Sequence, residues 1–101
     1  MKHKGKQVEK ILKKAIKVFG VDFQRWIWME EMSELTKAII KVKRYPNDKK
    51  RMDDLHEEIA DAVIVLHQMI LCYDKKKIMK YHKMKIDRLK ADTKKELKKK
   101  M

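Results

Sequence analysis

Apolar residues recur every three or four positions along four segments of the chain, and this spacing is typical of amphipathic helices. In the first segment, over roughly residues 7–19, the apolar positions are Val8, Ile11, Leu12, Ala15, Ile16 and Phe19. Gly20 suits the end of this helix, and Asp22 is placed to cap a second helix over roughly residues 23–44. No long stretch alternates apolar and polar residues, so no strand is predicted.

The segment Tyr45-Pro46-Asn47-Asp48 predicts a turn, because proline ends a helix and Asn47 or Asp48 can cap the next one. A third helix is expected from Lys49 or Arg51 to Tyr73, and a fourth from Lys76 into a basic tail over about residues 94–101, where the helix end is expected to fray. These segments predict one all-α domain, residues 1–101, built as a four-helix, bundle-like fold with short antiparallel connections.

Two acids interrupt the apolar arc of the second helix. On a helical wheel this arc gathers Phe23, Ile27, Trp28, Leu35, Ala38, Ile39 and Val42. Glu31 lies in the middle of the arc, and Gln24 also falls there. Glu34 lies inside the arc too, about 60° from Glu31 at the turn angle of an α-helix. The face that should enter the core therefore carries two carboxylates and an amide.

The third helix repeats this anomaly. Its apolar arc contains Leu55, Ile59, Ala62, Val63, Val65, Leu66, Met69 and Ile70. Glu58 lies within the arc and Asp61 lies at its edge, and their spacing of three residues puts both on one side of the helix.

Acids on core-facing arcs need a counter-charge, since burying an uncompensated carboxylate costs several kcal/mol. The two arcs contain no Lys or Arg, so we expect one or more divalent cations there. An all-oxygen site favours Mg²⁺ or Mn²⁺ over Zn²⁺, which prefers His or Cys ligands. The competing interpretation is that these Glu pairs decorate a solvated helix face.

The charge and the cysteine content indicate the setting of the protein. The chain has 101 residues and a net charge of +13, which favours anionic partners such as phosphorylated small molecules or nucleic acid. The single cysteine, Cys72, excludes an intrachain disulfide and fits a reducing, cytoplasmic location. The most apolar stretch, residues 59–72, is too short to span a bilayer, so no membrane partner is expected.

Two acidic motifs resemble the signature of the MazG-type all-α NTP pyrophosphatases. That signature, E-E-x-x-E-L followed on the next helix by E-x-x-D, is matched by residues 30–35 and by Glu58 with Asp61. Gln24 matches a glutamine common upstream, and residues 59–66 look like the apolar run that follows the aspartate. The similarity covers roughly residues 20–89 and looks like the short, single-domain, phage-type or MazG-like members.

The resemblance implies a metal-dependent enzyme that cleaves an NTP or dNTP between its α and β phosphates, in nucleotide-pool housecleaning. Its metal ligands would be Glu31, Glu34, Glu58 and Asp61, holding Mg²⁺ or Mn²⁺. Glu34 or Glu30 could accept the proton of the attacking water, and the sequence does not choose between them.

Substrate contacts are expected at four further residues. Lys85 and Arg88 resemble basic residues on the last helix of the family, and Lys83 lies beside them, whereas an asparagine common there is missing from residues 81–84. Gln24 could read a base edge and Trp28 could stack on the base.

Two other functions and an assembly are also consistent with the sequence. A basic helical nucleic-acid-binding protein would explain the charge but not the core-facing acids, and a non-catalytic MazG-like regulator would have no reason to keep them. We also expect a homodimer or a tetramer, because one thin core offers too little apolar area to cover two acid-bearing faces.

Overall fold

A computed structural model describes residues 5–101 as four helices with no strand among them. Their bounds are α1 Gly5–Phe19, α2 Val21–Arg44, α3 Lys49–Cys72 and α4 Lys75–Lys99. The predicted all-α, four-helix class is confirmed, and residues 1–4 of the predicted domain lie outside the described residues. The helix α4 continues to Lys99, so most of the basic tail is helical; the fraying of its end stays a prediction.

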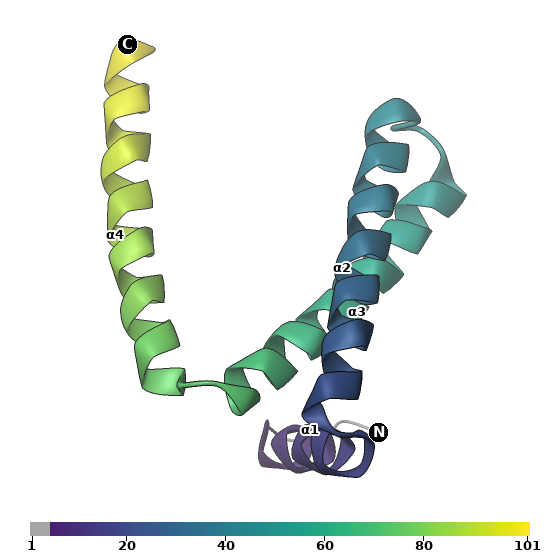
Figure 1. The fold of residues 1–101 in the computed structure, drawn as a ribbon. Coiled ribbons are helices and arrows are strands. Elements are labelled where there is room, and N and C mark those ends of the chain that lie inside the picture. Colours follow the sequence, from purple (N-terminus) through teal and green to yellow (C-terminus); the bar gives the residue numbers. More distant parts are fainter. Residues whose placement is uncertain (1–4) are drawn as a thin grey trace.

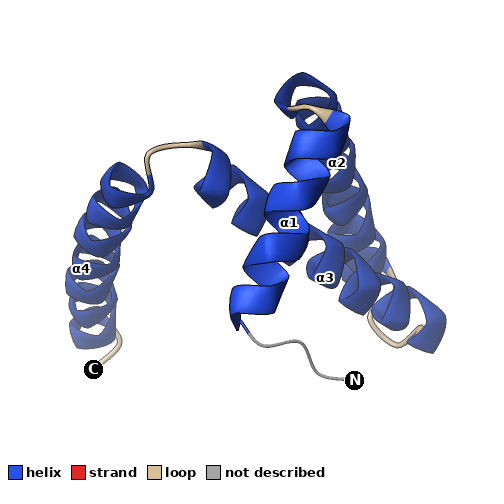
Figure 2. Ribbon diagram, turned by 90° about the horizontal axis from the view of Figure 1, so that it is seen from below, coloured by secondary structure: helices blue, strands red, loops and turns tan. Residues whose placement is uncertain are grey.

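The helices α2 and α3 form an antiparallel pair, and α1 lies across both of them (Figures 1 and 2). The buried apolar side chains come from these three helices: Leu12, Trp28, Ala38, Ala62 and Val65. This core is thin, because no side chain of the described chain is fully buried. Only part of each apolar arc is therefore buried, and Ile39 of α2 and Val63 of α3 remain 50% and 60% exposed.

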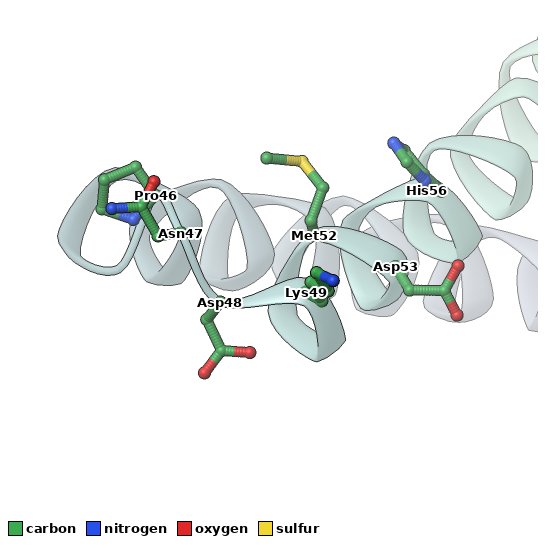
Figure 3. A pocket seen from close by; sticks show the side chains of 7 residues that line it. All are labelled: Pro46, Asn47, Asp48, Lys49, Met52, Asp53 and His56. Carbon is green, nitrogen blue, oxygen red and sulfur yellow. The ribbon is translucent and has the colours of Figure 1, made fainter.

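The connections between the helices are set by local backbone chemistry. Gly20 has a φ of 87° and ends α1 where the sequence predicted, and L side chains rarely adopt this conformation. Asp48 caps α3 by accepting a hydrogen bond of 3.0 Å from the backbone N–H of Arg51, as favoured N-cap residues do. Figure 3 shows Asp48 where the turn after Pro46 and Asn47 enters this helix. Asp74 caps α4 in the same way, by accepting from the N–H of Lys77 at 3.1 Å.

The prediction that Asp22 caps α2 was wrong. The helix begins at Val21, directly after Gly20, so Asp22 already lies inside its first turn. No side chain caps this end, and the Asp22 carboxylate instead lies 3.9 Å from the Arg25 guanidinium. An acid in the first turn still favours the helix through its dipole.

The last helix stands apart from the other three. It turns away from α3 at Asp74, touches only the end of that helix, and buries none of its own residues (Figure 1). The chain is accordingly extended, with principal dimensions of 54 × 37 × 29 Å. The expected bundle is thus not closed within one chain, since α4 does not lie along α2 and α3. None of the helices in residues 5–101 has the length and apolarity of a membrane span.

Candidate metal centre

Three of the four predicted ligands meet between α2 and α3. Glu31 of α2 faces Glu58 and Asp61 of α3, and one carboxylate oxygen of each lies within 4.8 Å of the others. The antiparallel register of the two helices brings Glu31 opposite this pair, and the three-residue spacing of Glu58 and Asp61 turns both toward it. Within residues 5–101 this is the one group of acids, histidines or cysteines with such geometry.

The cluster is electrostatically unbalanced. Burial raises the pKa of Glu31, and the nearby charges of Asp61 and Glu58 raise it further. Burial also raises the pKa of Glu58, with Asp61 as the next cause. The Oε2 atom of Glu58 is buried and has no hydrogen-bond partner, which is costly for a carboxylate oxygen. A cation among the three acids would offset their repulsion and would give Oε2 of Glu58 the partner that it lacks.

The residues fit a hard divalent cation. Three carboxylates from two helices supply only oxygen donors, which is the ligand chemistry of Mg²⁺ and Mn²⁺. Glu31 and Glu58 are half-buried, whereas Asp61 is exposed and leaves one side of the cluster open to solvent. An open side would allow water and a substrate oxygen to complete the coordination of an ion.

Glu34 lies outside the three-acid cluster. Its carboxylate is half exposed and lies 3.4 Å from the ammonium group of Lys37. It still contributes to the raised pKa of Glu58, after burial and Asp61, so it lies near the cluster. Glu30 is exposed and acts in the same minor way on the pKa of Glu31.

Cations are also closer to the acids than the sequence suggested. The apolar arcs contain no Lys or Arg, but basic residues at the margins of these arcs lie near the acids. A groove of ≈ 140 Å³ next to the cluster is lined by Glu34, Lys37, Ala38, Lys41, Arg51, Asp54, Glu57 and Glu58. A helical wheel cannot show this, because the groove combines the margins of two helices.

On its other side, the cluster borders a depression that carries two amides. This depression of ≈ 210 Å³ is lined by Gln24, Ile27, Glu31, Asp61, Ile64, Val65 and Gln68. Gln24 and Gln68 are only 6% and 5% exposed. Gln24 lines this depression together with Glu31 and Asp61, and its contact with a base edge stays a prediction. Gln68 was not among the predicted site residues, although an amide within an apolar stretch is a signal of the same kind as Gln24.

Trp28 lies in the core and lines a different surface from the amide depression. The residue is 4% exposed, and its Nε1–H donates a hydrogen bond of 2.9 Å to Oε1 of Gln68. The Trp28 and Tyr73 rings meet edge to face, and the Tyr73 hydroxyl accepts a hydrogen bond of 3.0 Å from Nε of Arg25. The indole therefore holds Gln68 in place beside the acids.

The basic residues expected to bind substrate are not brought to the cluster by their own chain. Lys85 and Arg88 are exposed on α4, which leads away from α2 and α3 (Figure 1). Lys83 is on the same exposed helix.

Comparison with known proteins finds no match: no family model, no curated protein and no solved structure matches this chain. The likeness to the MazG-type enzymes therefore rests on the two acidic motifs and their spacing.

Proposed function

We propose that the protein is a Mg²⁺- or Mn²⁺-dependent nucleoside triphosphate pyrophosphohydrolase. The observation that carries this proposal is the meeting of Glu31, Glu58 and Asp61, with a buried Glu58 oxygen that has no partner. The same three acids belong to the E-E-x-x-E-L and E-x-x-D motifs that resemble the MazG-type enzymes. Three of the four motif acids predicted as ligands thus lie together in the fold, and Glu34 lies near them.

The reaction needs a charged site but no covalent intermediate on the enzyme. Water attacks the α-phosphorus, the bond from this phosphorus to the bridging oxygen breaks, and pyrophosphate leaves with that oxygen. A divalent cation held by Glu31, Glu58 and Asp61 would neutralise phosphate charge and acidify a bound water. The chain's own contribution is to position these groups and to accept a proton.

Glu34 is the better-placed proton acceptor of the two candidates. It lines the groove together with Glu58, so its carboxylate faces the region where water and phosphate would meet. Glu30 does not line that groove. Lys37 pairs with Glu34 and would hold its carboxylate in position.

A homodimer belongs to this proposal. The outer face of α3 carries Ile59, Val63 and Leu66 at helical spacing, and they are 45%, 60% and 49% exposed. The helix α4 carries Ile86 and Leu89 with 50% and 61% exposure and buries nothing. A second copy would cover these stripes, and it could bring Lys85 and Arg88 of one copy to the acid cluster of the other.

The test is pyrophosphate release from a panel of NTPs, dNTPs and modified nucleotides with Mg²⁺ and with Mn²⁺. Asp61→Asn should reduce activity by roughly 100-fold or more, since losing even an outer-shell partner of a metal costs about 10–100-fold. Asp53→Asn is the matched control, because Asp53 is exposed on the same helix and lines neither side of the cluster. If the wild-type protein turns over none of these nucleotides, the proposed enzyme activity is rejected.

Nucleic-acid binding is the competing function, and the exposed lysines of α4 favour it. It predicts salt-dependent DNA or RNA binding that Asp61→Asn leaves unchanged. A non-catalytic regulator would instead bind a protein tightly without any hydrolysis.

A further inference from the structure

The acid cluster lies between two hollows of the α2–α3 surface that differ in chemistry. The amide depression with Gln24 and Gln68 shares Glu31 and Asp61 with the cluster, and the groove with Lys37 shares Glu58. A further groove of ≈ 320 Å³ is lined by Lys41, Asp48, Lys50, Arg51 and Asp54, and it shares Lys41, Arg51 and Asp54 with the previous one. The surface between α2 and α3 thus changes from amides through acids to cations, toward the α2–α3 turn.

At the cationic end, most acids already have a positive partner. Asp54 lies 3.1 Å from the ammonium group of Lys50, and Glu34 is paired with Lys37. Lys41 forms no ion pair with any described residue, although it lines both grooves. Among the lysines that line these two grooves, Lys41 is therefore the one whose charge is not already paired with a described acid.

Arg51 is held in a fixed position at the same place. Its guanidinium pairs with the Asp48 carboxylate and lies over the ring of Tyr45, 4.0 Å from the centroid. Arg51 also belongs to the first turn of α3, where the helix dipole favours anions. A guanidinium held by two neighbours loses little side-chain entropy on binding, and its remaining N–H groups suit phosphate oxygens.

We propose that Lys41 and Arg51 bind the terminal phosphates of the triphosphate, so that the phosphate tail points toward the α2–α3 turn. This inference rests on the proposed pyrophosphohydrolase function. The helical distance from Glu34 to Lys41 is about 10 Å, which a lysine side chain and a triphosphate can span together. The pyrophosphate product leaves from the cationic end, and the nucleoside lies toward Gln24 and Gln68.

The experiment compares Lys41→Gln with Lys43→Gln, which removes the same charge from the far face of the same helix. Lys41→Gln should lower kcat/KM about tenfold and weaken binding of Mg²⁺-pyrophosphate, measured by calorimetry, about tenfold, as expected for one charged hydrogen bond. Lys43→Gln should stay within about twofold of wild type on both measurements, and Lys41→Arg should restore most of the loss.

The outcomes separate this inference from the proposed function. If wild-type protein hydrolyses nucleotides and the two glutamine variants behave alike, the proposed cationic subsite is wrong, whereas the proposed enzyme activity is kept. If wild-type protein hydrolyses no nucleotide, the proposed enzyme activity is wrong. Calorimetry with Mg²⁺-pyrophosphate then still decides the subsite, since equal affinity of the two variants, or no binding by wild type, overturns it.

Discussion

The α2–α3 pair and α4 are helices of similar length, yet they occupy very different environments. The pair holds nearly all the buried side chains, the Trp28–Gln68 hydrogen bond and the acid cluster, whereas α4 buries nothing. Both regions carry amphipathic patterns, and both α3 and α4 begin with an aspartate cap. The difference shows that an apolar stripe makes a helix possible, while only contact with a second stripe creates a core and a site.

The largest expected effect comes from the acid that is least satisfied. Glu58→Gln should lower pyrophosphate release by roughly 100-fold or more, because it removes a proposed metal ligand. The same change should raise the thermal midpoint of the metal-free protein, since it removes the negative charge from a buried oxygen without a partner. Activity assays and calorimetric melting with and without Mg²⁺ would measure both, and a variant that keeps full activity would contradict the metal centre.

The next effect compares two tryptophans on α2. In Trp28→Phe, Oε1 of Gln68 loses its buried donor. An unsatisfied buried acceptor should lower the free energy of unfolding by about 2 kcal/mol. Trp26 is 67% exposed. Trp26→Phe, as a surface substitution, should therefore change the free energy of unfolding by less than about 0.5 kcal/mol. Denaturant unfolding measures both values, and equal values for the two would show that the hydrogen bond contributes little.

Val63→Glu addresses the proposed homodimer on the outer face of α3. If a second copy covers this face, the glutamate should weaken dimerisation at least roughly tenfold, because a charge would be buried in an apolar contact. Sedimentation at several concentrations measures the change. A wild-type protein that sediments as an active monomer would remove the dimer from the proposal.

The smallest effect compares the two aspartate caps. Asp48→Ala should lower the melting midpoint by roughly 4–8 °C, as expected for the loss of one N-cap in a domain of this size. Asp74→Ala should shift it less, because α4 adds no buried residue to the core. A larger shift for Asp74→Ala would mean that α4 packs on a partner that completes the core.

The Asp48 cap also predicts a pH dependence. The backbone N–H of Arg51 holds the pKa of Asp48 below its ordinary value. Because the folded-state pKa is lowered, the cap stabilises fully above the pKa of Asp48 in the unfolded chain. This stabilisation is lost as the pH falls through the folded-state pKa. The difference between wild type and Asp48→Ala should therefore shrink in acid, as melting curves between neutral and acidic pH would show.

Local patterns in the sequence predict the four helices and most of their ends, because helical periodicity, Gly20 and the turn at residues 45–48 each act on residues close by in the chain. They also place Glu58 and Asp61 on one side of α3, since a three-residue spacing fixes this without any partner. What they misjudged locally was the cap at Asp22, where α2 begins one residue after Gly20.

The packing of the helices sets which side chains of different helices meet. It brought Glu31 to Glu58 and Asp61 and joined Trp28 to Gln68. It also placed Lys41 and Arg51 in one groove and kept α4 away from it. These outcomes depend on the register and crossing of two helices, which helical periodicity does not specify, because it describes one helix at a time.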